Sequence, residues 1–486
     1  MPDSPRLARQ TAITAGLLVM NNPSTVSYRK IWLMSYPLMI SLIIEHMIGL
    51  TDAIFLGRLG DVALGACALG GVYYMAMFML AFGFGFGAQI IIARRNGERR
   101  YNRIAPTMIQ GCYFMLALAL LLFFASRYLS PSILRHAIES PQVFGATMEY
   151  LHWRTYGVFF SFLCVMFRSY YVGITQTKIL TVNSIVMLLS NVVLNYCLIF
   201  GKGGFPAMGV AGAAIASSVA EAVSLVFFII YTGITADKRK YGFRRAFTFR
   251  PQLLKGMLSI SGWTMVQSFL SVSIWFIFFL AIEHLGERPL AVTNIVRNIA
   301  AMLIMIISAF ATTAGALISN QIGAGEQRFL FKTCRMTLNL AYALLIPLLI
   351  VLCLFPEPIL RIFTDNPSLI TASIPSVYVM ATSTLISAPA FILFNAVSGT
   401  GNTRLAADKI AAALERRGMR AAVWEARLPL EEAPDPRDYD VAGFGYPIHA
   451  FNTPRFFLRF AKGLPQVKAM PAFLFKTSGE PFHLNS

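Results

Sequence analysis

Ten apolar stretches, each long enough to cross a lipid bilayer as a helix, dominate this chain of 486 residues. A membrane-spanning helix takes about 20 predominantly apolar residues, because the hydrocarbon core cannot hydrogen-bond an exposed backbone. Charged residues make up 13% of the sequence, whereas soluble domains have about one quarter. We therefore predict an all-α polytopic membrane protein. The predicted spans are 31–56, 62–93, 104–127, 144–173, 179–200, 207–234, 253–282, 289–320, 333–355 and 371–397.

The net charge of +18 comes from basic residues in the short gaps between these stretches. Because they do not form one stripe, the pattern argues against nucleic acid as a partner and indicates membrane topology. Alternate gaps carry the basic excess, which places them in the cytoplasm. An even number of spans then leaves the N-terminal tail (1–27) and the C-terminal tail cytoplasmic, in a multi-pass inner-membrane protein. The basic gaps hold Arg29, Lys30, Arg94, Arg95, Arg99, Arg100, Arg103, Lys178, Lys238, Arg239, Lys240, Arg244, Arg245, Arg250, Arg328, Lys332 and Arg335.

The six cysteines all lie inside apolar stretches, and no two have the CxxC spacing. That distribution predicts small packing residues rather than a disulfide framework or a metal site.

An internal repeat indicates two related halves. Residues 87–90 and 97–98 (GAQI, then GE) match residues 315–318 and 325–326 (GALI, then GE), 228 positions later. Upstream, Leu59-Gly60 matches Leu285-Gly286 at an offset of 226, so a small insertion is expected between the two matches. Two lobes about a central cleft are typical of transporters, although a repeated generic helix hairpin is the alternative. The predicted lobes are 28–250, with six spans, and 251–403, with four.

Ionisable residues inside the spans are the first candidates for function, since each costs about 2.5–3.5 kcal/mol to insert. Glu45 and Asp52 lie seven residues apart, and therefore on one face of the first helix. Arg168 and Glu221 lie in the fourth and sixth spans. We interpret Asp52 as a cation or proton site, with Glu45 beside the same cleft. The alternatives are a buried Asp52–Arg168 ion pair or an acid that snorkels to a helix end.

A carboxylate in a cleft of low dielectric constant can exchange a proton or Na⁺ for a cationic substrate. The inward-driven ion displaces the substrate when the cleft faces outward, and the freed carboxylate binds substrate again when it faces inward. This exchange is antiport.

Several motifs resemble the MATE (multidrug and toxic compound extrusion) family over residues 28 to about 404. They are Ser35-Tyr36-Pro37, Gly49-Leu50-Thr51-Asp52, Gly57-Arg58-Leu59-Gly60, the run from Asn191 to Asn195, and 209–214 (GVAGAA). The resemblance implies a two-lobed helical exporter of organic cations, driven by Na⁺ or H⁺ and without an enzymatic cofactor. It also implies that the acid at Asp52 contributes to coupling. We expect a monomer.

Two departures from the MATE pattern bear on the coupling ion. Many relatives carry an acid where this chain has Asn195, and some carry one near Gln267. Neutral amides can ligate Na⁺ but cannot carry a proton; alternatively, both residues serve as interhelical hydrogen-bonding groups. Candidates for an adaptable pocket wall are Tyr73, Tyr74, Met75, Met77, Phe78 and Met79, although packing is the simpler role for any one of them.

After residue 398 the apolar character ends, and residues 404–486 resemble the N-terminal part of a flavodoxin-like α/β domain. We predict helices over 405–418 and 453–463, and strands over 421–425, 440–446 and 471–475. In flavodoxins a hydroxyl-rich loop binds the FMN phosphate, and residues 445–450 resemble the second loop, beside the flavin ring. The phosphate-loop residues would be Ser398, Thr400, Gly401, Asn402 and Thr403.

The segment around residues 391–403 matches both families, and it cannot serve both. As the tenth span it is helical, whereas as the first strand of a flavodoxin it is extended. MATE relatives have twelve spans and this chain has ten, so we expect a chimera of two joined coding sequences that transports poorly. The alternative function is FMN-dependent electron transfer by the tail.

Overall fold

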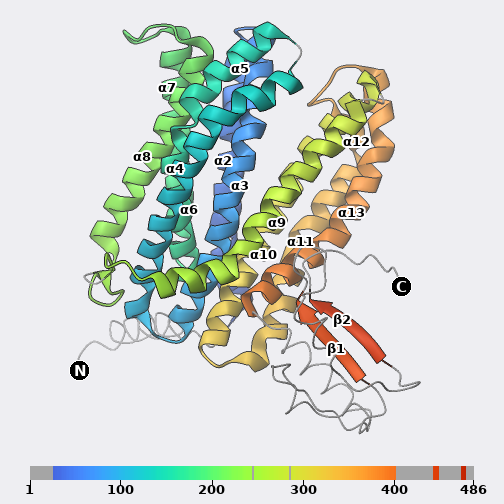
Figure 1. Cartoon of the computed structure of the whole chain (residues 1–486). Coiled ribbons are helices and arrows are strands. Elements are labelled where there is room, and N and C mark those ends of the chain that lie inside the picture. Colours follow the sequence, from blue (N-terminus) through green and yellow to red (C-terminus); the bar gives the residue numbers. More distant parts are fainter. Residues whose placement is uncertain are drawn as a thin grey trace, which may run out of the picture.

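The computed structural model describes residues 26–138, 140–243, 246–283, 286–400, 442–447 and 472–477. Among them, nine helices are long and apolar enough to cross a membrane, and they run side by side along one direction (Figure 1). The chain is thus a multi-pass membrane protein. The nine are α2 (Tyr28–Gly57), α3 (Asp61–Gly97), α4 (Ile104–Ala137), α7 (Lys178–Phe200), α8 (Gly209–Thr235), α9 (Pro251–Glu283), α10 (Glu287–Gly323), α11 (Leu330–Leu354) and α13 (Pro367–Thr400).

The predicted fourth span is two helices, α5 (Pro141–Arg154) and α6 (Gly157–Gly173), rather than one. Thr155 lies at the break, where its hydroxyl donates to the Leu151 carbonyl at 2.8 Å. Such a side-chain bond competes with the helical backbone and bends it. Gly157 follows, and a Cβ there would meet the side chains of Arg154 and Glu221. The break therefore lets the backbone pass close to a charged pair.

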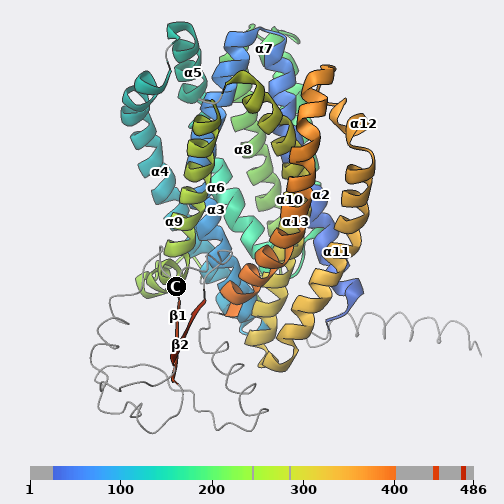
Figure 2. The same cartoon turned by 90° about the vertical axis from the view of Figure 1, so that its right-hand side faces the viewer.

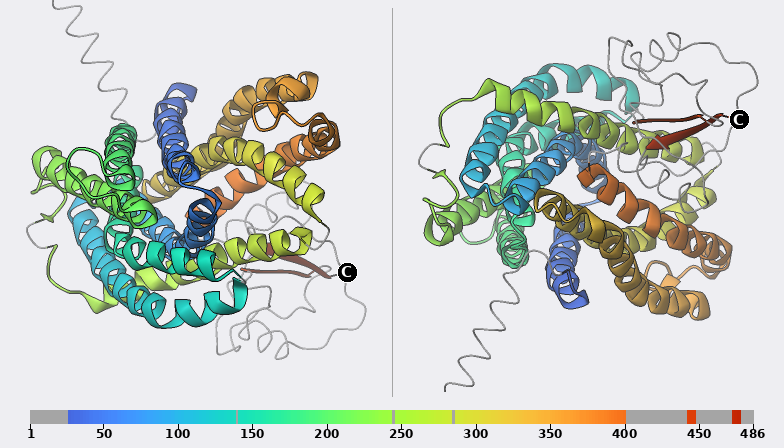
Figure 3. Two further views of the ribbon diagram at one scale, coloured as in Figure 1. Left: turned by 90° about the horizontal axis from the view of Figure 1, so that it is seen from above. Right: turned by 90° about the horizontal axis from the view of Figure 1, so that it is seen from below.

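The helices form two groups, visible end-on in Figure 3 and from the side in Figure 2. In the first, α2 packs on α7, α7 on α8, and α3 on α6. In the second, α10 packs on α13 and α11, and the short α12 (Pro356–Leu360) connects α11 to α13. Helix α9 packs mainly on α3, where Gly83 and Gly87 leave no room for a Cβ against residues of α9.

The structure confirms a repeat but corrects its register. Helices α3 and α10 both have 37 residues, and each is followed by a 3₁₀ turn, Tyr101–Arg103 or Gln327–Phe329. Helix starts, helix ends and turns are all offset by 226 positions. The offset of 228 predicted from residues 87–90 and 315–318 is therefore wrong, and the expected insertion is not present between the described helices α3 and α10. The short Gly-Ala and Gly-Glu matches lie two residues out of structural register.

Helices α3 and α10 cross at the ends where their arginine-rich and glycine-rich turns begin. A Cβ at Gly97 would overlap the backbone of Asn320, and a Cβ at Gly323 would overlap the backbone of Arg94. These two contacts are equivalent under the shift of 226 positions. Asn96 adds a hydrogen bond, its Nδ2 donating to Oδ1 of Asn320 at 2.7 Å. The repeated elements thus meet each other across one axis.

The segment shared by the two resemblances is helical, because α13 continues to Thr400. The extended first strand required by the flavodoxin alternative is therefore wrong, and the backbone of Ser398 and Thr400 belongs to a helix rather than a phosphate loop. Gly401, Asn402 and Thr403 lie outside the described residues. The strands expected at 440–446 and 471–475 are confirmed as β1 (Ala442–Pro447) and β2 (Ala472–Thr477), which pair in parallel. The remaining predicted elements of the tail lie outside the described residues.

Candidate cation-binding site

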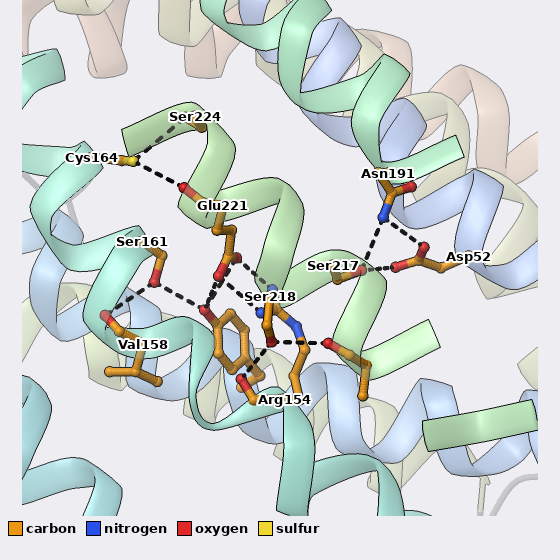
Figure 4. A network of polar contacts seen from close by, with 12 residues as sticks. Asp52, Arg154, Val158, Ser161, Cys164, Asn191, Ser217, Ser218, Glu221 and Ser224 are labelled. Carbon is orange, nitrogen blue, oxygen red and sulfur yellow. Dashed lines mark hydrogen bonds and ion pairs between the residues drawn. The ribbon is translucent and has the colours of Figure 1, made fainter. Parts of the chain in front are cut away.

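Asp52 lies buried between α2, α7 and α8, and three neutral side chains donate hydrogen bonds to it. Figure 4 shows two of them, Asn191 and Ser217. Asn195 Nδ2 donates to Oδ1 at 2.6 Å, and Asn191 Nδ2 donates to the same oxygen at 3.2 Å. Ser217 Oγ donates to Oδ2 at 2.8 Å. No ion pair joins Asp52 to a Lys, Arg or His in the described part of the chain. The carboxylate is therefore well solvated by neutral dipoles but has no ion-pair partner in the described part of the chain.

Glu45 and Asp52 share one face of α2, as their spacing predicted. Glu45 accepts from Ser184 of α7 at 3.1 Å, and Asp52 accepts from Asn191, seven residues further along the same helix. The predicted alternative of an Asp52–Arg168 pair is wrong, because Arg168 Nη1 donates instead to both oxygens of Glu45, at 2.8 and 2.9 Å. Glu45 is thus already neutralised by a protein cation.

Glu221 has the shortest ion pair among the described residues, with Arg154. Arg154 Nη2 donates to Oε1 at 2.6 Å and Nη1 to Oε2 at 3.0 Å, which is the bidentate arrangement. The Tyr74 hydroxyl donates to the same carboxylate at 2.9 Å, and the Arg154 guanidinium carbon lies 3.6 Å from the centre of the Tyr74 ring. The charges of Arg154 and Glu221 therefore cancel, and both Nη groups and the Tyr74 hydroxyl donate to the one carboxylate.

One polar atom beside Asp52 has no hydrogen-bond partner among the described residues. It is Oδ1 of Asn195, which is fully buried. Asn195 uses its amide protons on Asp52 and on Oδ1 of Asn191, at 2.6 and 3.1 Å. A buried acceptor without a donor is costly unless a ligand satisfies it. Carboxylate and amide oxygens together are the donor set that hard cations prefer.

The other sequence candidates separate from this site. Gln267 lies half-buried on α9, a helix that packs on α3 rather than on α2, α7 or α8. Within the pocket-wall candidates, Tyr74 and Met77 are buried in the first group, whereas Met75 is exposed. Tyr74 is therefore a partner of Glu221, and the set does not act as one surface.

Three contributors were missed in the sequence. Arg154 lies inside the predicted fourth span but was overlooked, although the polar run His152-Trp153-Arg154-Thr155 interrupts that span and gives the signal for it. Asn191 was noted only as the start of a MATE-like run and not as a site residue, and Ser217 had no distinguishing sequence signal, because serine is common where membrane helices pack.

Comparison with known proteins assigns the helical part of the chain. The family model described as MatE matches residues 37–197 and 264–412. The chain belongs to the MatE family. MATE proteins are secondary multidrug transporters rather than enzymes, and they need no enzymatic cofactor. The matched ranges include most of α2 and most of α7, with Asp52, Asn191 and Asn195.

Individual relatives agree with this assignment. The chain is 25% identical over 304 residues to a probable multidrug resistance protein NorM of Mannheimia succiniciproducens, which is 61% of this chain and 64% of that protein. It is 24% identical over 370 residues to a probable NorM of Aromatoleum aromaticum, which is 75% of this chain and 79% of that protein.

A solved structure shows the same MATE fold. It is a multidrug resistance MATE family transporter of the MOP superfamily in an outward-facing conformation, and it superimposes with a TM-score of 0.71 at 20% identity. The match covers 77% of this chain and 83% of the other.

Proposed function

We propose that this protein is a cation-coupled antiporter that exports organic cations across the bacterial inner membrane, with Na⁺ or H⁺ as the driving ion. The proposal rests on the MatE family assignment and on the charge balance of three membrane carboxylates. Its two lobes would be residues 28–250 and 251–403, with the basic turns and both termini in the cytoplasm. As a monomer, the protein would carry small cationic drugs.

The charge balance is the observation that carries the proposal. Glu45 is neutralised by Arg168, and Glu221 by Arg154. Asp52 alone of the three has only neutral donors. A buried carboxylate that lacks a protein cation is stable when a proton or an external cation neutralises it. Asp52 is therefore the acid at which charges can be exchanged.

Sodium is favoured over a proton by the oxygen of Asn195. This oxygen lies in the Asp52 cluster without a donor, and a bound Na⁺ would satisfy it together with the carboxylate. A proton on Asp52 would neutralise the carboxylate but leave the Asn195 oxygen unchanged. Glu45, Arg168, Glu221 and Gln267 then have supporting or substrate-contacting roles.

The test is drug efflux from vesicles that contain the purified chain and a fluorescent organic cation, driven in turn by a Na⁺ gradient and by a pH gradient. Because the chain is expected to transport poorly, we expect slow efflux with the Na⁺ gradient and its loss in Asp52→Asn, which keeps the shape but removes the charge. The matched control is Asp61→Asn, since Asp61 is an exposed acid at the start of α3. Unchanged efflux in Asp52→Asn contradicts the proposal; efflux with the pH gradient alone assigns H⁺ as the ion.

The FMN alternative has no further support. The parallel pair of β1 and β2 fits an α/β tail, but the segment before the phosphate loop is helical. We expect the absorbance spectrum of the purified protein to show no flavin band at about 450 nm.

A further inference from the structure

A cavity of about 340 Å³ lies between α4 and α5, away from Asp52. Its size is in the range of sites for small organic groups. Six of its nine lining residues are polar, which is unusual on a membrane helix. The polar lining includes Ser126, Arg127, Ser130, Glu149, His152 and Thr155.

The cavity lies at the level where a membrane's headgroups are found. Between Arg103 and Arg127 the chain has no charged residue over 104–126. At 1.5 Å per residue this segment is about 35 Å long, slightly more than the ~30 Å hydrocarbon core. Trp153 and Tyr156, both partly exposed, lie beside it, and these residue types concentrate at the membrane–water interface.

Arg127 supplies a positive charge that no carboxylate neutralises among the described residues. One guanidinium nitrogen contacts Nδ1 of His152, and the other lies 3.3 Å from Nε2 of His152 and 3.3 Å from the Tyr156 hydroxyl. The guanidinium also lies 5.6 Å from the centre of the Phe123 ring. These neutral and aromatic contacts hold the side chain in place and leave its charge available to an anion.

Glu149 gives the cavity an opposite charge, because it is an exposed acid on the lining without an ion pair in the described chain. The hydroxyls of Ser126 and Ser130, on buried residues, line the same space. A ligand with both an anionic phosphate and a protonated amine matches these two charges and the hydroxyls. A purely anionic ligand would meet Glu149 unfavourably.

An exposed apolar stripe on α4 leads from the cavity towards the middle of the membrane. It consists of Leu116, Leu120, Leu121 and Phe124, which are between 40% and 65% exposed. Leu116, Leu120 and Phe124 are spaced four residues apart, with Leu121 next to Leu120, which places the set along one side of the helix. An acyl chain attached to a headgroup in the cavity would lie on this stripe, whereas a soluble ligand would leave it unused.

We propose that this cavity binds a phospholipid with a primary amine headgroup, such as phosphatidylethanolamine. Arg127 binds the phosphate, Glu149 binds the ammonium group, and the α4 stripe contacts an acyl chain. The cavity is also lined by the last turn of α5, next to Arg154. Lipid occupancy thus bears on the break between α5 and α6. This site does not depend on the proposed transport function.

The test is native mass spectrometry of the purified full-length chain, delipidated and then incubated with one dioleoyl lipid at a time. We expect phosphatidylethanolamine to be retained more strongly than phosphatidylcholine, which has no N–H donor, and than anionic phosphatidylglycerol. Arg127→Gln is expected to lower this retention about tenfold. The matched control is Arg135→Gln, which removes the same charge two turns along α4, outside the cavity lining.

Glu149→Gln keeps the proposal testable if Arg127→Gln does not fold, because Glu149 is exposed and has no ion pair in the described chain. We expect it to abolish the preference for the amine lipid over phosphatidylcholine. Equal retention of the three lipids by the unmodified chain, or an unchanged preference in Glu149→Gln, overturns the assignment. Displacement of the lipid by glycerophosphoethanolamine or inorganic phosphate at equal concentration overturns the role of the acyl chain.

Discussion

Asp52 and Glu221 are both held at helix α8, at positions one helical turn apart, but they differ completely in how their charges are neutralised. Ser217 of α8 donates to Asp52, and Glu221, four residues later, binds Arg154. Figure 4 shows the two clusters on either side of this helix. Glu221 has an arginine and a tyrosine hydroxyl, whereas Asp52 has two amides and a serine. Helix α8 therefore contacts both kinds of acid: its own Glu221, which is permanently neutralised, and Asp52 of α2, which needs a cation from outside.

The comparison separates structural from exchangeable charge. A bidentate pair in a buried site keeps its geometry because breaking it leaves an uncompensated charge. Neutral donors stabilise a carboxylate without cancelling it, so a mobile cation can enter and leave. Burial alone did not distinguish the two acids; the identity of their partners did.

The largest expected effect concerns the closed pair. Arg154→Leu leaves Glu221 buried without its cation, and we expect the free energy of unfolding to fall by about 3–5 kcal/mol. It can be measured by SDS titration in mixed micelles. The double variant Arg154→Leu with Glu221→Leu removes both charges, and we expect it to recover most of the loss. A double variant as unstable as the single one would show that the pair does not act through charge.

A smaller effect is expected at Asn195, in the open cluster. Asn195→Leu removes the hydrogen bond from the amide to Asp52, and with it the amide oxygen that has no donor. The lost charge-assisted hydrogen bond costs about 1.5–3 kcal/mol. We expect a higher Na⁺ concentration for half-maximal efflux, measured in vesicles. Asn183→Leu is the matched control, because Asn183 is a buried amide of α7 bonded to Ser224 rather than to Asp52. Equal shifts in both variants would contradict a specific Na⁺ role.

The smallest effect is expected for the partly exposed pair of Glu45 and Arg168. Their side chains are 32% and 20% exposed, so water weakens the attraction. We expect Glu45→Gln to lower the free energy of unfolding by about 1 kcal/mol or less, as measured in the same SDS titration. A loss as large as that of Arg154→Leu would place Glu45 with the buried pair and reduce the contrast drawn above.

The sequence predicted the helical class because each span needs a long apolar segment, and nothing else in the chain provides one. It also singled out Asp52 as a candidate, since an acid in such a segment is rare. It did not predict the break at Thr155, because averaging apolar character over residues 144–173 hides two or three polar positions. The pairing of Arg154 with Glu221 spans 67 positions, and spacing rules work only within one helix.

The partners of Arg168 were wrong for a related reason. Three membrane acids and one arginine were recognised from their positions inside predicted spans, and spacing alone could not decide which acid that arginine reaches. Helix packing decides which acid Arg168 reaches. Along α2 and α7, Ser184 lies beside Glu45 and Asn191 lies beside Asp52, two turns further on. Arg168 lies at the level of Glu45. The register of the repeat was likewise fixed by helix ends and turns rather than by matching letters.

The crossing of α3 and α10 has a consequence for any motion between the two helix groups. Gly97 packs against the backbone of Asn320 and Gly323 packs against the backbone of Arg94, and the two contacts are equivalent under the internal repeat. Because both contacts lie at the same crossing, separating α3 from α10 at this end breaks the two contacts together rather than one at a time. A bulky side chain at Gly97 or at Gly323 would therefore push α3 and α10 apart at the same crossing.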